Sequence, residues 1–264
     1  MNKVSDILSY ITEVAPLQWQ ENYDNSGLLI GDANAMVDKA LLTLDVTEKV
    51  IDEAIENSFH LVISHHPLIF KGIKNILADN TIGRIITKAI KNDISIASMH
   101  TNLDNSFVGV NRVLADKLGL KDLQILHQNN SDEELPVGSG MIGVLEEEMS
   151  ENAFLSLVKE KLNVPAIRHS ELLNRPIKKV ALCGGSGSFL INDAKRCKAD
   201  VYLTADVKYH EFFDADNEIL ILDAGHFETE QFTKQLFADI ILKKNPKFAV
   251  QISSVKTNSV HYFV

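Results

Sequence analysis

The sequence has little of what marks secreted or membrane proteins. Its 264 residues include two cysteines, Cys183 and Cys197, which provide no disulfide framework and stand at no metal-site spacing. This cysteine usage indicates a reducing compartment. No apolar run approaches the about 20 residues that cross a bilayer. Lys3 precedes any long apolar run, so the first residues do not form a signal peptide. We therefore expect a cytoplasmic protein without a membrane-spanning segment.

Basic residues are also scarce relative to acidic ones. The sequence has 26 lysines and arginines against 36 aspartates and glutamates, which gives a formal net charge of −10. Because phosphate contacts need clustered Lys and Arg, this balance argues against a nucleic-acid partner. The glycine-rich segment Gly184–Ser188 lacks the lysine of a P-loop and the spacing of a dinucleotide fingerprint. An ordinary turn explains it, although its backbone N–H groups would suit an anion.

The chain does contain a regular alternation of short apolar runs with longer amphipathic ones. This order predicts an α/β fold, with two α/β domains and mixed, largely parallel sheets. A polar connector is expected at 128–134. The predicted strands lie at 40–44, 60–63, 94–99, 139–145, 179–183, 200–204 and 218–223, and the predicted helices at 50–55, 82–90, 108–118, 151–162 and 190–197.

Two histidine motifs come directly after predicted strands. Ser64-His65-His66-Pro67 follows the strand at 60–63, and Pro67 breaks that strand, so both imidazoles can face one site. His100-Thr101-Asn102-Leu103-Asp104 follows the strand at 94–99. Ligands bind at this edge of an open α/β sheet. The alternatives are exposed loop histidines and an Asp104 that caps the next helix, although Thr101, Asn102 and Ser106 are equally able caps.

A third motif, Gly225-His226-Phe227-Glu228-Thr229-Glu230, follows the predicted strand that ends at Asp223. His226 and Glu230 stand at i and i+4, so the first turn of a helix would place both on one face. Imidazole with carboxylate is a ligand set for divalent transition metals. The alternative is a surface histidine with a polar neighbour.

Other polar residues near strand ends have more than one explanation. His210, four residues beyond Asp206, stands among Tyr209, Phe212 and Phe213, and is either a packed histidine or a neighbour of the site. Asp45 ends a strand and is a candidate for the lining of a pocket. Turn formation explains the polar segment around Asp24.

Four motifs occur in the order and spacing of one protein family: Asp24-Asn25-Ser26-Gly27-Leu28, Ser64–Pro67, His100–Asp104 and Gly225–Glu230. The chain resembles the Nif-three-like dinuclear metal-binding family, often labelled GTP cyclohydrolase I type 2 homologues, over nearly its whole length. The resemblance implies a Nif-three-like fold, assembly into homohexamers, and metal ligation by His65, His66, Asp104, His226 and Glu230. The chain departs from the family pattern at Thr204-Ala205-Asp206, where family members often have Thr-Gly-Glu.

These observations lead to one expected function and one rival. We expect a metal-dependent hydrolase that binds two divalent ions (zinc, iron, manganese or nickel) and uses metal-activated water on a small nucleotide-like or phosphorylated substrate. His100 is the expected proton-transfer or ligand-orienting residue. The rival is a non-catalytic metal-binding, metal-chaperone or regulatory protein. Residues 1–127 and 223–264 are expected to form the metal-binding domain, and 128–222 the second domain.

Overall fold

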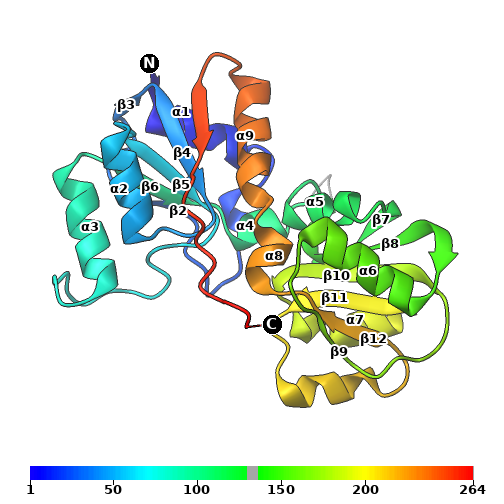
Figure 1. The fold of residues 1–264 in the computed structure, drawn as a ribbon. Coiled ribbons are helices and arrows are strands. Elements are labelled where there is room, and N and C mark those ends of the chain that lie inside the picture. Colours follow the sequence, from blue (N-terminus) through cyan, green and yellow to red (C-terminus); the bar gives the residue numbers. More distant parts are fainter. Residues whose placement is uncertain (130–135, 264) are drawn as a thin grey trace. The chain divides into compact units, whose positions relative to one another are not determined.

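The computed structural model describes residues 1–129 and 136–263. The chain forms two compact units, of which unit 1 comprises Met1–Leu103 and Thr233–Ser259, and unit 2 comprises Asp104–Phe232 and Val260–Val264. Each unit has a sheet with helices (Figure 1). The predicted α/β class with mixed sheets is therefore confirmed. No helix among the described residues has the length and apolar character to span a bilayer.

The sheet of unit 1 is largely parallel. Its strand order is β13-β4-β5-β6-β2, with only β2 antiparallel to its neighbour. The central strands β4, β5 and β6 are buried on both faces, which explains their continuous apolar runs. The strands are β2 (Gly27–Ile30), β4 (Lys39–Thr43), β5 (Leu61–Ser64), β6 (Ser95–Ser98) and β13 (Ala249–Ile252), and a separate pair joins β1 (Asn2–Lys3) to β3 (Met36–Val37).

Helices cover both faces of this sheet. In Figure 1, α2 (Glu48–Glu56) and α3 (Thr81–Lys91) lie on one side, and α1 (Val4–Thr12) and α9 (Thr233–Lys244) lie on the other. Side-chain caps fix two of the helix starts: Thr47 accepts a hydrogen bond from Val50 N, and Asn80 accepts one from Gly83 N. A short 3₁₀ helix, η1 (Leu17–Trp19), follows α1.

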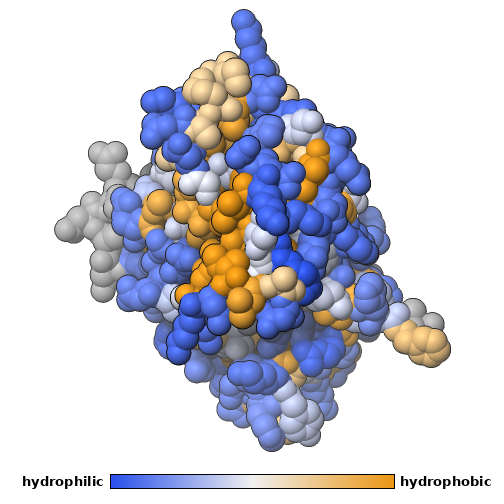
Figure 2. Space-filling model, turned by 90° about the vertical axis from the view of Figure 1, so that its left-hand side faces the viewer, coloured by the Kyte–Doolittle hydropathy of each residue, from blue (hydrophilic) through white to orange (hydrophobic). Residues whose placement is uncertain are grey.

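The segment from β5 through α3 exposes apolar side chains. Phe70, Ile73, Ile76 and Leu77 are each at least 40% exposed. Figure 2 views the molecule from the side where α3 lies in Figure 1 and shows hydrophobic side chains gathered in the middle of that face. Exposed apolar patches of this kind commonly mark interaction surfaces.

The sheet of unit 2 is mixed, with the order β7-β8-β10-β11-β12-β9. Its parallel centre carries antiparallel strands at both edges. Its strands are β7 (Lys121–Gln128), β8 (Gly138–Met149), β9 (Arg168–His169), β10 (Ile177–Ser186), β11 (Val201–Ala205) and β12 (Leu220–Asp223).

Two hydrophobic clusters cover the faces of the unit 2 sheet. Side chains of α5 and α6 pack with Leu182 and Leu203, whereas α7 packs with the alternate residues Ala181 and Tyr202. The helices of this unit are α5 (Val110–Lys117), α6 (Glu151–Leu162), α7 (Ile191–Arg196) and α8 (His226–Glu230), with the 3₁₀ helices η2 (Ser188–Leu190) and η3 (Tyr209–Ala215). Helix α4 (Thr101–Asp104) carries the chain from unit 1 into unit 2.

The extents of the two units differ from the predicted domain ranges. Strand β7 pairs with β8 in the sheet of unit 2, so residues 104–127 join that unit. Helix α8 contacts β10, where Gly185 N donates to Thr229 Oγ1, and it belongs to the same unit. The predicted connector at 128–134 lies outside the described residues at 130–134, and Gln128 is the last residue of β7.

The buried carboxylate of Glu53, on α2, is hydrogen-bonded to the segment that follows β13. Glu53 is 8% exposed and accepts hydrogen bonds from Ser253 Oγ, Ser254 N and Ser254 Oγ. Burial raises the pKa of this carboxyl group, but these hydrogen bonds outweigh burial and leave the pKa below its ordinary value.

Replacing Glu53 with glutamine is expected to lower the free energy of unfolding by about 1 kcal/mol at neutral pH, because the amide accepts these bonds more weakly. Since the folded-state pKa lies below the unfolded-state value, the carboxylate stabilises the fold above the unfolded-state pKa and loses this effect as the pH falls through the folded-state pKa. Urea unfolding should therefore show a wild-type advantage that shrinks on acidification. Glu56→Gln, at an exposed position of the same helix, is the control. An advantage independent of pH would contradict this account.

Candidate metal centre

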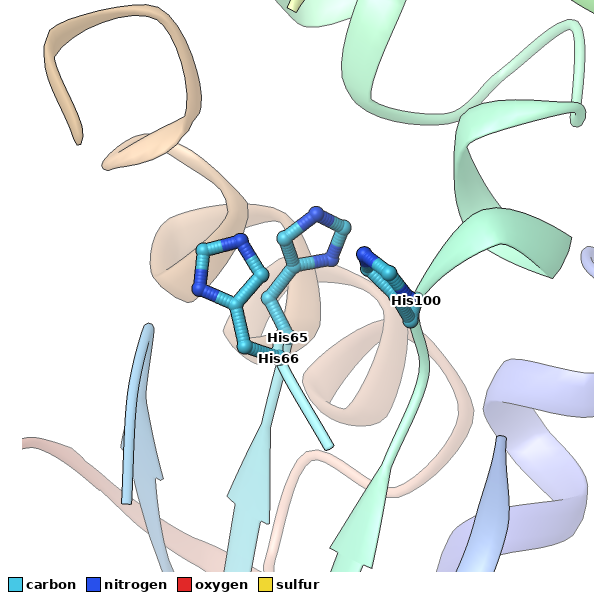
Figure 3. A group of neighbouring side chains, drawn as sticks. All are labelled: His65, His66 and His100. Atoms are coloured by element: carbon cyan, nitrogen blue, oxygen red, sulfur yellow. The ribbon is translucent and has the colours of Figure 1, made fainter. Parts of the chain in front are cut away.

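Unit 1 brings three histidines together. His65 and His66 follow β5, and His100 follows β6, its parallel neighbour, with Ser64 and Ser98 in register. The three rings therefore gather beyond the same edge of the sheet (Figure 3). Their centroids lie 4.9 Å (His65–His66), 5.2 Å (His65–His100) and 5.5 Å (His66–His100) apart. Each ring offers one nitrogen within 4.8 Å of those of the other two, a spacing that suits a shared metal ion.

Each of these imidazoles is held through Nδ1. The Nδ1 atom of His65 lies 2.9 Å from Met99 O, that of His66 lies 2.7 Å from Asp45 Oδ1, and that of His100 lies 2.8 Å from Asp24 Oδ1. Carbonyl and carboxylate oxygens only accept, so each Nδ1 donates and the neutral ring keeps its lone pair on Nε2. Metal-binding histidines are held in this way, with the second nitrogen bonded to a carboxylate or carbonyl.

Asp24 is the most extensively bonded of these supports. Besides His100, it accepts hydrogen bonds from Thr101 Oγ1, Thr101 N and Ser26 Oγ. Burial raises the pKa of Asp24, but the bonds from His100 and Thr101 outweigh it and hold the pKa well below its usual range. The polar turn expected around Asp24 is thus also the anchor of His100. Asp45 likewise supports His66 and accepts a hydrogen bond from Thr257.

Unit 2 contributes a second cluster. His226 and Glu230 on α8 face each other as their i,i+4 spacing predicts, with 3.0 Å between His226 Nε2 and Glu230 Oε2. Asp206, directly after β11, lies 2.6 Å from His226 Nδ1. Burial favours neutral His226, but the two carboxylates prevail and raise its pKa to about 11. This excess of negative charge attracts a cation to the cluster.

The glycine-rich turn makes room for Glu230. A Cβ on Gly185 would lie 2.1 Å from Glu230 Oε1 and would displace that carboxylate, and the φ of +62° at Gly185 strains any residue with a side chain. The N–H of Gly184 donates to Asn111 Oδ1, and that of Gly185 donates to Thr229 Oγ1. Both groups are already engaged, so packing against α8, rather than anion binding, explains these two glycines.

Comparison with known proteins places the chain in a family. The model of the Duf34/NIF3 (NGG1p interacting factor 3) family matches residues 2–259. The chain belongs to this family.

Relatives and solved structures agree with this assignment. A Campylobacter jejuni protein named GTP cyclohydrolase 1 type 2 homolog is 38% identical over 99% of this chain and 100% of its own length. A Clostridium perfringens protein of the same name is 39% identical over 86% of this chain and 87% of its own. The crystal structure of a Bacillus cereus protein related to NIF3 superposes with a TM-score of 0.93, at 28% identity, and covers 100% of this chain and 99% of that one.

The remaining sequence-predicted residues divide between the units of this NIF3-family chain. Asp104, the last residue of α4, is the first residue of unit 2. It does not cap α5, whose N-cap is Gly109, so that explanation of Asp104 fails. His210 is exposed on η3, with its ring 5.1 Å from that of Tyr209 and 6.3 Å from that of Phe213, and it is not a packed core histidine.

Proposed function

We propose that this NIF3-family chain is a metal-dependent hydrolase that acts on a small nucleotide-like or phosphorylated molecule. The observation that carries the proposal is the trio of histidines in unit 1, whose rings are each held through Nδ1 and bring one nitrogen apiece within 4.8 Å of the others. His65 and His66 would join Asp104, His226 and Glu230 as ligands of two divalent ions. When bound, such ions supply Lewis acidity and lower the pKa of water.

The donor set supports a reactive rather than a structural centre. Structural zinc sites are commonly closed by cysteine and histidine. Here, Cys183 and Cys197 are free thiols, and the proposed ligands are imidazoles and carboxylates. This chemistry suits zinc, iron, manganese or nickel. Free thiols are also consistent with the proposed cytoplasmic location.

Several of the proposed ligands stand close in sequence to the points where the chain passes from one unit to the other. Leu103 and Asp104 are adjacent residues that belong to different units, and His100 precedes them by one helical turn. Glu230 likewise stands three residues before Thr233, where the chain returns to unit 1. The motifs of both units thus lie near these points in the sequence.

His100 is the proposed proton-transfer residue. Its hydrogen bond to Asp24 fixes the ring and leaves the lone pair of the neutral imidazole on Nε2. The Nε2 atom is then the position that takes or gives a proton beside His65 and His66. Asp24 acts through His100 and is a positioning residue.

The names of the relatives guide the choice of substrate. Because they are called GTP cyclohydrolase 1 type 2 homologs, GTP belongs in any panel. The test strips the protein of metal, reloads it with each candidate ion, and assays it on nucleotides and phosphoesters. Turnover that appears only on reloading is expected. Undiminished turnover after verified metal removal would overturn the proposal, and metal binding without turnover on any substrate would identify a metal carrier or regulatory protein.

Elemental analysis is expected to find two equivalents of metal per chain at saturation. Five protein ligands exceed the three that a single catalytic zinc usually takes. Glu230→Ala should reduce the bound metal towards one equivalent, because it removes a buried carboxylate from the proposed ligand set. Glu147→Gln, an exposed acidic position in unit 2, should keep both equivalents. One equivalent in the wild type, unchanged in Glu230→Ala, would contradict the dinuclear assignment.

We further propose that the chain assembles into a homohexamer. The C-terminal residues Val260, Tyr262 and Phe263 are exposed rather than part of a core, and the segment from Phe70 to Leu77 adds a second apolar surface. Burial of such surfaces drives association between copies. Light scattering at micromolar concentration measures the assembly, and a monomer would contradict it.

A further inference from the structure

Unit 2 contains a cavity that the proposed metal centre does not use. Its volume is about 560 Å³, within the range of small-molecule sites. One wall comes from the segment after β9, including Glu171, and the other comes from η3 and the turn after it.

The wall formed by η3 is aromatic. Tyr209, Phe212 and Phe213 all line the cavity. Tyr209 is 72% exposed and Phe213 is 66% exposed. Their rings meet edge to face, with centroids 5.6 Å apart. Large aromatic side chains left this open to solvent offer π-faces to a ligand at little cost in desolvation.

The charge of the cavity is negative. Glu171 and Asp216 line it together with the neutral Asn217. No ion pair among the described residues uses either carboxylate. Of the nearby cations, Arg168 pairs with Asp223 and Lys195 pairs with Glu218, while Arg175 donates to the backbone oxygen of Glu218. Two carboxylates beside aromatic faces are the surroundings that an organic cation requires.

One of these aromatic rings, that of Phe212, already makes a cation–π contact within the chain. The guanidinium carbon of Arg168 lies 5.4 Å from the centroid of Phe212. Phe212 lines the cavity, whereas Arg168 does not.

From these contacts we infer that the cavity binds a small organic cation, an ammonium or guanidinium group carried on an apolar carbon chain. The cationic group would lie against Tyr209 and Phe213 and be neutralised by Glu171 and Asp216. The carbon chain would fill the rest of the apolar wall. This binding is independent of the proposed metal centre, because none of the lining residues belongs to the proposed ligand set.

Agmatine, which carries a guanidinium and an ammonium group, is a suitable probe, with uncharged N-butylurea as its neutral counterpart. Calorimetric titration of the full chain should show saturable agmatine binding and much weaker butylurea binding. Tyr209→Ala and Phe213→Ala should each weaken agmatine binding roughly 3- to 30-fold, the range of cation–π contacts. Glu171→Gln and Asp216→Asn should weaken it and reduce its salt dependence.

Two matched controls lie outside the cavity in the same unit. Phe189→Ala removes an aromatic ring that is 63% exposed, and Glu147→Gln removes an exposed carboxylate. Both should bind agmatine like the wild type, with and without added metal. Absence of saturable binding would overturn the inference. So would equal affinity for butylurea, or affinity that survives both Tyr209→Ala and Phe213→Ala.

Discussion

Replacing His66 with alanine is expected to remove metal binding and turnover together. The His66 ring is oriented by Asp45 and stands beside His65 and His100. Loss of a supporting residue alone costs about 10- to 100-fold in metal affinity. Loss of a direct ligand should cost more, so the dialysed variant should retain little metal by elemental analysis.

Two further variants make this result specific. Asp45→Asn keeps the His66 ring but replaces its charged support, and it should weaken metal binding by about 10- to 100-fold without abolishing it. His60→Ala removes an exposed histidine of the same unit whose Nδ1 lies near Asp93 O, and it should leave metal content unchanged. Full metal occupancy in His66→Ala would remove His66 from the ligand set and count against the proposed centre.

The sequence was sufficient to predict the strands that precede the histidine ligands, but not the short helix α4, which ends at Asp104. Apolar runs marked β5 and β6 because both are buried on two faces, and the polar residues that end them were therefore conspicuous. The i,i+4 spacing of His226 and Glu230 predicted a contact that the structure contains. These signals are local, and local periodicity can encode them.

The supports of the histidines could not be predicted in the same way. Asp24 contacts His100 across 76 positions in the sequence, and Asp45 contacts His66 across 21. No helical or strand period links residues so far apart, and the pairings arise only when strands assemble into a sheet. One signal did exist: Asp45 and Asp206, like the histidines, stand within two residues of the end of a buried strand, at the sheet edge where ligands bind.

The boundaries of the two units also depend on contacts between residues far apart in the sequence. The polar composition at 128–134 indicated a domain connector, yet β7 and β8 on either side of this segment pair with each other. Strand pairing, a non-local property, assigned residues 104–127 to unit 2.

Replacing His100 with alanine is expected to slow turnover by roughly 10²- to 10⁴-fold, the contribution of a positioned general acid or base. Both metal ions should remain, because His100 is not among the five proposed ligands. Asp24→Asn should give a smaller loss, since the ring stays but its charged support is gone. The measurements are kcat and KM on the substrate identified in the panel, together with elemental analysis of each variant.

A structural role and a proton-transfer role for His100 predict different readouts. In proton transfer, kcat falls while KM changes little, and added imidazole restores part of the rate of His100→Ala. Nitrogen NMR of the Asp24→Asn variant should also show the His100 imidazole losing its preference for the Nδ1–H form, because a neutral amide can donate to Nδ1 as well as accept from it. Loss of metal from His100→Ala would instead make His100 a ligand, which its ring nitrogen, within 4.8 Å of those of His65 and His66, has the position to be. Unchanged kcat with full metal content would exclude both roles.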